Sequence, residues 1–356
     1  MGTQFFGAVT FMIPHSRPWI SRSDQLAVSS ALATSMIARG KRVAEFEQAV
    51  AELACVDYAV AMSSGSAALA LALETLSIGS GDEVIMPTYV CRSVLEAVMA
   101  TGAAPVVCDV DHTGVLDLAT ARSKISARTK AVIAVHIFGR FCDIASLQEL
   151  GVPVIEDACQ AFGLRVNGGV AGGLGDIGIY SFHATKCLTT GEGGMLVTAN
   201  HTIAKRARML VEENRSTFRQ MFAPLSDLQA ALGLSQLSRY EVFLERRELI
   251  RAEYLRAVVA QGIQGGELNM AGAPFRFTVF SNHPFELLKN RFAEHGIAIR
   301  KGVDELLHRL LSLEDTEFPS AKELFEKTVS IPFYPSLSLG ELSKVQSALV
   351  LLAHEG

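Results

Sequence analysis

The chain has 356 residues, of which 49% are hydrophobic and 19% charged, and its formal net charge is -5. This composition indicates a globular protein with an ample core, large enough for one large domain and a smaller one. The acidic balance without a basic stripe argues against nucleic-acid binding. No apolar run reaches the roughly 18–20 residues that a membrane helix needs.

The N-terminal stretch and the cysteines indicate in which cellular compartment the protein is expected. Residues 1–11 lack the charged start and the small-residue cleavage site of a signal peptide. The six cysteines form no CxxC pair, so neither a metal site nor a disulfide framework is indicated. We therefore expect a cytoplasmic protein without a bound metal.

The first half of the chain alternates between strand and helix patterns. Helical patterns cover about 24–37, the stretch that starts at Val43, and 67–76. Strand patterns are expected at 58–62, 82–87, 105–110, 131–136, 153–156, 177–182 and 195–197. Such alternation predicts an α/β fold whose large domain has a mostly parallel sheet covered on both faces.

The second half has a different texture. Ser226 and Gln229 form a capping-box pair at the start of a helical pattern that continues to about Val259. Short strands and helices follow at 275–280, 284–295, 318–327 and 341–352. We expect a large domain over residues 1–240 and a smaller C-terminal α+β domain over 241–356.

Three strand ends carry chemistry. Ser64-Gly65-Ser66 lies between a strand and a helix, where free N–H groups can bind an anion, although most such turns are only tight connections. Glu156 and Asp157 end another strand, and at most one of the two can point into a crevice. Lys186 follows a third strand, and a solvated loop lysine would explain that stretch alone equally well.

Taken together, the three features have one explanation that none of them has alone. Pyridoxal 5′-phosphate needs an anion site for its phosphate, a carboxylate for its pyridine nitrogen and a lysine for its aldehyde. The glycine-rich stretch 168–175 does not end in Gly-Lys-Ser/Thr and precedes no helix, so it does not indicate a nucleoside triphosphate. We interpret it as an irregular loop between strands.

At this point the chain resembles the DegT/StrS family of sugar aminotransferases, which have the type I fold of pyridoxal-phosphate-dependent transferases. The resemblance covers nearly the whole chain. Its motifs are Gly81-Asp82-Glu83-Val84-Ile85, Glu156-Asp157-Ala158 with Gln160, Ser181-Phe182-His183 with Lys186, Glu192-Gly193-Gly194, and Asp227-Leu228-Gln229-Ala230-Ala231.

The resemblance implies roles for individual residues. Lys186 would form the Schiff base, Asp157 would pair with the pyridine nitrogen, and Gln160 would lie beside the cofactor's O3′ oxygen. Gly65, Ser66 and Ser181 would hold the phosphate. His183 would line the substrate side, although a packed histidine is equally consistent with its position.

Two positions depart from the family pattern. Cys91 stands where the family has an aromatic residue stacked on the pyridine ring, so that stacking is either lost or supplied by Tyr89. Phe222 stands where the family has an asparagine that reaches the phosphate of the neighbouring subunit. Arg215 or Arg219 is the candidate replacement for that contact, and a solvated loop charge is the competing interpretation.

The resemblance therefore implies an aminotransferase that moves an amino group from an amino acid, glutamate or glutamine, to a keto sugar linked to a nucleotide. It also implies a homodimer. A sugar dehydratase of the same family is the nearest alternative, but it typically has histidine at the position of Lys186. A regulatory protein that binds the cofactor without turnover is another alternative, and a lyase that uses Cys187 or Cys91 as sulfur carrier has little support.

Overall fold

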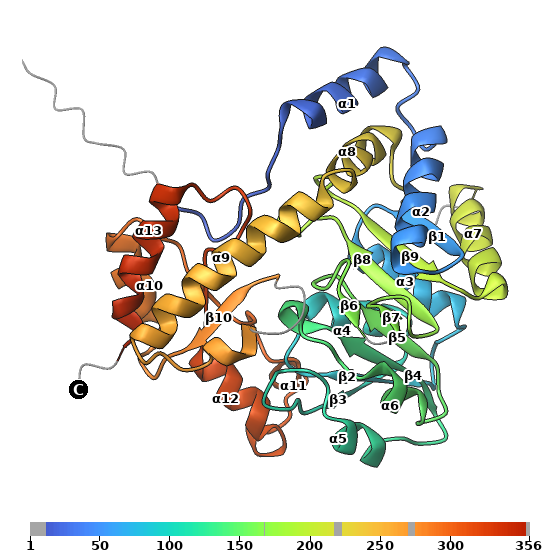
Figure 1. Cartoon of the computed structure of the whole chain (residues 1–356). Coiled ribbons are helices and arrows are strands. Elements are labelled where there is room, and N and C mark those ends of the chain that lie inside the picture. The colour runs from blue at the N-terminus through green and yellow to red at the C-terminus, as the bar shows by residue number, and fades with distance from the viewer. Residues whose placement is uncertain (1–11, 167, 217–222, 270–274, 354–356) are drawn as a thin grey trace, which may run out of the picture.

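The structure is a computed structural model that describes residues 12–166, 168–216, 223–269 and 275–353. Figure 1 shows a large α/β body and a smaller body, joined by the long helix α9 (Tyr240–Ala260) that runs diagonally between them. Within the described residues, no helix is both long and apolar enough to cross a membrane.

The large body is built on a seven-stranded sheet. In spatial order its strands are β1 (Tyr58–Met62), β9 (Gly194–Thr198), β8 (Ile177–Ser181), β5 (Val154–Asp157), β4 (Thr129–Val135), β2 (Glu83–Pro87) and β3 (Ala104–Cys108). Strand β9 pairs antiparallel with both β1 and β8, whereas the other pairs are parallel. The predicted α/β fold with a mostly parallel sheet is therefore confirmed.

Both faces of this sheet are buried, as β1 shows. Val60 and Met62 pack in one apolar cluster with helix α3, whereas Ala59 and Ala61 pack on the other face in a cluster with α2. Alternate residues of a strand point to opposite faces, so this near-continuous apolar run serves two cores. The helices of the large body are α1 (Arg22–Ala33), α2 (Lys41–Ala54), α3 (Gly65–Thr75), α4 (Arg92–Ala100), α5 (Leu118–Ser123), α6 (Ile144–Gln148), α7 (His201–Ser216) and α8 (Asp227–Leu237), with a 3₁₀ turn η1 (Ile137–Gly139).

The smaller body has an antiparallel sheet of β10 (Phe277–Phe280), β12 (Thr328–Ile331) and β11 (Arg300–Lys301), in that order. Its other elements are α10 (Phe285–Glu294), α11 (Leu307–Leu310), α12 (Pro319–Lys327), α13 (Leu339–Ala348) and the 3₁₀ turns η2 (Gly266–Asn269), η3 (Asp315–Glu317) and η4 (Leu349–Leu352). A small antiparallel sheet with helices is the α+β organisation expected for the C-terminal part.

The single helical pattern expected over 226–259 forms two helices, α8 and α9, so the prediction of one helix is wrong. The capping box of Ser226 and Gln229 is present at the start of α8. Arg239 then has φ -117° and ψ 11°, which interrupts the helix. The break redirects the chain so that Tyr240 and Phe243 pack with the large body and Ile250 and Tyr254 pack with the small one.

The division into two domains at residues 240 and 241 stays a prediction. Helix α9 does begin at Tyr240. Some segments, however, pack across that boundary in the sequence: Ile13 joins the apolar cluster of the small body, and Leu307, Phe318 and Leu324 join that of the large sheet. The chain therefore crosses between the two bodies more than once.

Candidate active site

The predicted site residues lie at one edge of the large sheet, where the parallel strands end. Asp157 ends β5 and Ser181 ends β8, which pairs directly with β5. Lys186 lies in the loop between β8 and β9, and α3 begins directly after β1. Ligands of open α/β sheets bind outside the carboxyl ends of the strands, so the topology itself gathers these side chains.

The N-terminus of α3 forms an anion cradle. The side chain of Ser64 caps the helix by accepting the Ala67 N–H at 3.1 Å. The N–H groups of Gly65 and Ser66 have no acceptor among the described residues, and they lie at the positive end of the helix dipole. A Cβ at Gly65 would lie only 2.9 Å from Ser181 Cβ, so glycine is needed for this close approach.

Asp157 and Gln160 each keep part of their hydrogen-bonding capacity unused. Oδ1 of Asp157 accepts the Cys159 N–H at 3.0 Å and the Cys159 thiol interacts with the same carboxylate, whereas no basic side chain of the described residues forms an ion pair with it. Oε1 of Gln160 accepts the Phe138 N–H at 2.9 Å, which orients the amide and assigns its NH₂ group to the other side. An unpaired carboxylate and an amide donor thus remain for a ligand.

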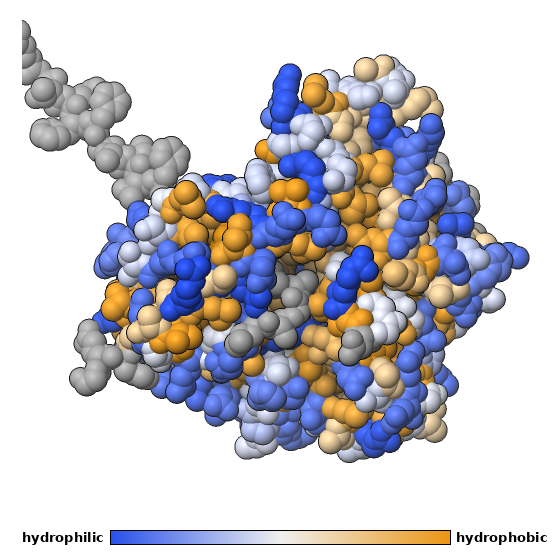
Figure 2. All heavy atoms as spheres, viewed as in Figure 1, coloured by the Kyte–Doolittle hydropathy of each residue, from blue (hydrophilic) through white to orange (hydrophobic). Residues whose placement is uncertain are grey.

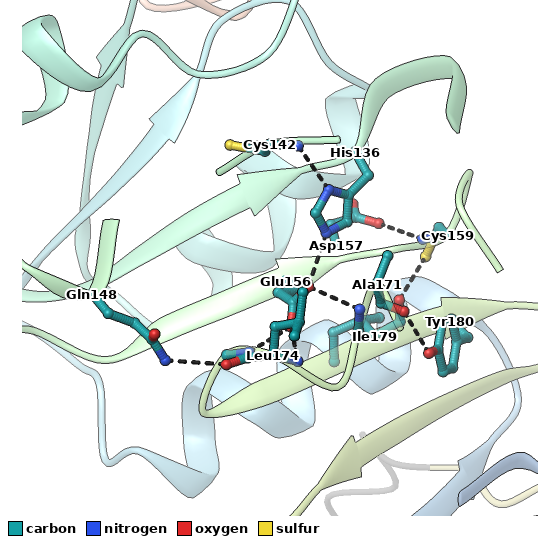
Figure 3. A network of polar contacts seen from close by, with 12 residues as sticks. His136, Cys142, Gln148, Glu156, Asp157, Cys159, Ala171, Leu174, Ile179 and Tyr180 are labelled. Atoms are coloured by element: carbon teal, nitrogen blue, oxygen red, sulfur yellow. Dashed lines mark hydrogen bonds and ion pairs between the residues drawn. The ribbon is translucent and has the colours of Figure 1, made fainter. Parts of the chain in front are cut away.

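Glu156, the neighbour of Asp157 on β5, is fully buried on the opposite side of the strand (Figure 3). Its carboxylate accepts the N–H groups of Gly172 at 2.8 Å, Leu174 at 2.7 Å and Gly175 at 2.5 Å. His136 Nδ1 accepts the Cys142 N–H at 3.1 Å, so its Nε2–H donates to Glu156 at 2.9 Å. The alternation of a strand therefore gives the two acids different functions, as predicted.

The loop that Glu156 holds is the glycine-rich stretch of the sequence. Its first part, β7 (Gly169–Val170), pairs with the preceding β6 (Arg165–Val166) in a short hairpin that the sequence analysis did not predict, and irregular backbone follows. Three backbone N–H groups of this loop converge on one carboxylate, so the loop is anchored to strand β5.

Lys186 is partly buried, and its Nζ lies 4.9 Å from the centre of the Phe275 ring. No hydrogen bond or ion pair of Nζ exists within the described residues. The aromatic face positions the amine without using its hydrogen-bonding capacity. Lys186 therefore differs from a solvated loop lysine, because an aromatic side chain from the small body holds it in place.

His183 is exposed and belongs to a short polar chain. Its Nδ1 accepts the Thr185 N–H at 3.2 Å and lies 2.8 Å from Thr185 Oγ1. The backbone donor assigns the ring proton to Nε2, which lies 3.5 Å from Glu192 Oε1. His183 is thus oriented by its neighbours and is not packed in a core.

One cavity of about 550 Å³ is lined by the anion cradle and by the side chains that the resemblance assigns to the site. The predicted site residues that line it are Gly65, Ser66, Cys91, Asp157, Gln160, Ser181, His183 and Lys186. The structure therefore brings every residue of the predicted site to one place, although their roles stay predictions. A cavity of this size lies within the range of about 300–1,000 Å³ that is usual for small-molecule sites.

The two departures from the family pattern have different outcomes. Cys91 lines the cavity as the N-terminal cap residue of α4. Tyr89 is fully buried, packs edge-on against Phe138 at 6.2 Å and does not line the cavity, so it cannot supply the stacking that Cys91 lacks. Phe222 and Arg219 lie outside the described residues, and the side chain of Arg215 is likewise not described.

Sequence reasoning missed several residues of the cavity. Cys159 lines the cavity next to Gly65, and burial raises the pKa of its thiol well above the usual range. Phe275, Arg276 and Arg300 come from the small body. Only Cys159 lies within a recognisable motif, whereas the other three follow Lys186 by about 90 residues or more and carry no local signal.

The residues present fit pyridoxal 5′-phosphate. The α3 cradle leaves two N–H groups for a phosphate, and its glycine admits the close approach that a Cβ would block. The carboxylate of Asp157 and the amide of Gln160 suit a protonated pyridine nitrogen and a phenolic oxygen, respectively. Lys186, with its free Nζ, faces the same cavity.

Comparisons with known proteins lead to the same chemistry. Residues 18–350 match the model of the DegT/DnrJ/EryC1/StrS aminotransferase family. The spore coat polysaccharide biosynthesis protein SpsC of Bacillus subtilis (strain 168) is 31% identical to this chain over 375 residues, which covers 95% of the chain and 96% of SpsC.

Two solved structures extend the likeness to the fold. The aminotransferase TlmJ from Streptoalloteichus hindustanus is 29% identical, with a TM-score of 0.87 over 95% of this chain and 98% of its own. Spr1654 from Streptococcus pneumoniae in its pyridoxal-phosphate form is 24% identical, with a TM-score of 0.87 over 96% of this chain and 98% of its own. The chain belongs to the DegT/DnrJ/EryC1/StrS family of sugar aminotransferases, enzymes that depend on pyridoxal 5′-phosphate.

Proposed function

We propose that the chain transfers the amino group of an amino acid, glutamate or glutamine, to the keto group of a nucleotide-linked sugar. The main support for this proposal is that Lys186 lines one cavity together with Asp157 and the α3 cradle. SpsC is named for polysaccharide biosynthesis, which supports a sugar as the acceptor. The nucleotide and the donor rest on the resemblance in the motifs.

The chain's own residues then have distinct tasks. When bound, pyridoxal phosphate supplies an aldehyde that takes up the amino group and a ring that withdraws electrons from the substrate. Gly65, Ser66 and Ser181 hold the phosphate, and Asp157 keeps the ring nitrogen protonated. Lys186 carries the cofactor and moves a proton to and from the substrate carbon at Nζ.

The proposal is tested by following both half-reactions in the purified protein. Addition of L-glutamate to the yellow, cofactor-loaded protein should bleach its absorbance, and a keto sugar nucleotide should restore it. Transfer of ¹⁵N from labelled glutamate into the sugar would exclude a dehydratase, which adds no nitrogen. A protein that binds the cofactor but neither bleaches nor transfers nitrogen would be regulatory, and the proposal would fail.

Replacing Asp157 with asparagine should lower the rate of transamination by about 100-fold or more, which corresponds to roughly 3 kcal/mol. Asparagine keeps the size of the side chain but removes the charge that pairs with the ring nitrogen, and a buried partner left alone is strongly disfavoured. The cofactor should still bind, which its absorbance would show.

The matched control is Asp143→Asn. Asp143 is an exposed aspartate that also accepts a backbone N–H, that of Ser146 at 3.3 Å, as the cap of α6. Asparagine caps helices as well as aspartate does, so this variant should keep wild-type turnover. Equal rates for Asp157→Asn and Asp143→Asn would refute the assignment of Asp157.

We also propose a homodimer, on the basis of the family. Exposed apolar side chains around α1 support it, namely Leu26, Leu32, Met36 and Ile37. Figure 2 shows apolar residues among polar ones along α1, at the top of the view. A soluble monomer seldom leaves such a cluster in water, whereas an interface buries it.

Light scattering at micromolar concentration should therefore give about twice the chain mass of 38.3 kDa. Met36→Lys in combination with Ile37→Lys should move the mass toward that of one chain, because two charges would enter an apolar contact. Leu339→Lys, at an equally exposed position on α13, is the control and should leave the dimer intact. A fully active wild-type monomer would contradict the proposal.

A further inference from the structure

Two arginines of the small body, Arg276 and Arg300, line the candidate active-site cavity. Both also line a second hollow of about 50 Å³, which shares Thr185, Lys186 and Phe275 with the cavity. Both arginines thus line a large cavity and a small one, together with the lysine on which the proposed chemistry depends.

The surroundings of Arg276 hold its guanidinium but leave donors unused. Nη1 donates to the carbonyl oxygens of Gly302 at 2.9 Å and Lys301 at 3.3 Å. The guanidinium also lies 5.6 Å from the centre of the Phe275 ring and 5.7 Å from that of Phe138. Its Nε is buried without a hydrogen-bond partner, and Nη2 makes no bond among the described residues.

Arg300 is exposed and makes no hydrogen bond or ion pair within the described part of the chain. Its charge lies close enough to Arg276 that, after burial itself, it is the main cause lowering the pKa of Arg276. Burial and the same two arginines lower the pKa of His15 to about 3, so this histidine, which also lines the small hollow, is neutral. Asp304 also faces the cavity and acts on Arg276 by its charge, but it pairs with neither arginine.

Two like charges held together without a bound counter-charge are unfavourable, and an anion would relieve them. A guanidinium fork matches a carboxylate with two parallel hydrogen bonds. The hollow of about 50 Å³ is far smaller than the cavity of about 550 Å³, so a small anionic group such as a carboxylate suits it better than a large one.

We propose that Arg276 and Arg300 form a subsite that binds the carboxylate of a substrate, an inference that rests on the proposed aminotransferase function. A ligand of amino-acid size reaches both ends of the site, because Lys186 and Arg276 contact the same Phe275 ring. The carboxylate belongs either to the amino donor or to an acidic sugar. The subsite orients that substrate so that its reacting carbon faces Lys186.

Calorimetry on the cofactor-loaded protein measures binding of a carboxylate to this subsite independently of turnover. Glutarate represents the donor's carboxylates but has no amino group to react, glucuronate represents an acidic sugar, and glucose is the neutral control. Arg300→Gln removes a guanidinium that makes no hydrogen bond or ion pair within the described residues. It should weaken binding of glutarate, glucuronate or both by about tenfold or more, because a hydrogen bond to a charged group is lost.

The matched variant is Arg92→Gln, because Arg92 lines the same cavity but is already paired with Glu96 at 2.8 Å and Glu305 at 3.7 Å. It should change binding of either carboxylate by less than about twofold. The carboxylate that responds to Arg300→Gln identifies the source, and the apparent KM for the corresponding substrate should rise by the same factor. The proposed subsite would be refuted if neither carboxylate bound to the wild type. It would also be refuted if Arg300→Gln and Arg92→Gln lost the same amount of binding.

Failure of the subsite and failure of the proposed function are distinguishable. If the wild type transfers no amino group but Arg300→Gln still loses carboxylate binding, the subsite stands and the function falls. If transamination proceeds and Arg300→Gln leaves carboxylate binding and KM unchanged, the function stands and the subsite falls.

Discussion

Replacing Lys186 with alanine should abolish transamination, with a loss of about 10⁴-fold or more, while the protein remains folded. The variant loses both the amine that carries the cofactor and the base that moves the proton, and a positioned acid–base group alone contributes up to about 10⁴-fold. The fold should tolerate the change, because Nζ makes no hydrogen bond within the described residues and lies over the Phe275 ring. Steady-state rates and the unfolding midpoint measure the two effects.

Lys124→Ala is a close control for this experiment. Lys124 is also partly buried, and its Nζ lies 5.2 Å from the centre of the Phe318 ring, outside the cavity. Its Nζ donates to the carbonyl of Val107 at 2.9 Å, so the variant should lose some stability but keep its turnover. A cofactor adduct mapped by mass spectrometry to a lysine other than Lys186 would refute the assignment.

The parts of the site that were predictable from the sequence are the local ones. Asp157 ends a strand, and Lys186 and Ser64 to Ser66 follow strands. Apolar residues predict each of these strands, and parallel strands bring their carboxyl ends to one edge of the sheet. The buried alternation of β5 also follows from the sequence, because neighbouring residues of a strand face opposite sides. Family motifs then gave each local feature its expected role.

The rest could not be predicted, because it depends on contacts between distant segments. Phe275, Arg276 and Arg300 reach the cavity only because α9 carries the chain to a second sheet, and nothing near them in the sequence signals a ligand. The break at Arg239 is similar: one helical pattern serves two cores, and only tertiary packing decides where it bends. Likewise, no local pattern predicts that backbone N–H groups of the glycine-rich loop donate hydrogen bonds to the carboxylate of Glu156.

Replacing Glu156 with alanine should lower the free energy of unfolding by about 3–5 kcal/mol. The fully buried carboxylate accepts three backbone N–H groups, from Gly172, Leu174 and Gly175, and the Nε2–H of His136. Alanine would leave all four donors without an acceptor, in a place that water does not reach. Each unsatisfied buried donor costs about 1–3 kcal/mol before the surroundings relax.

Glu149→Ala is the control, since Glu149 is 70% exposed and forms only a surface ion pair with Arg122 at 3.5 Å. Such a pair is worth about 0–1 kcal/mol, so the urea midpoint should hardly move. The midpoint of Glu156→Ala should fall well below it at a similar slope. Equal midpoints would show that the loop finds other acceptors.

Because Asp157 follows Glu156 on the same strand, a loosened loop should also displace the carboxylate that faces the cavity. Glu156→Ala should therefore lower the rate of transamination even at temperatures where the protein is folded, which a residue that served stability alone would not do.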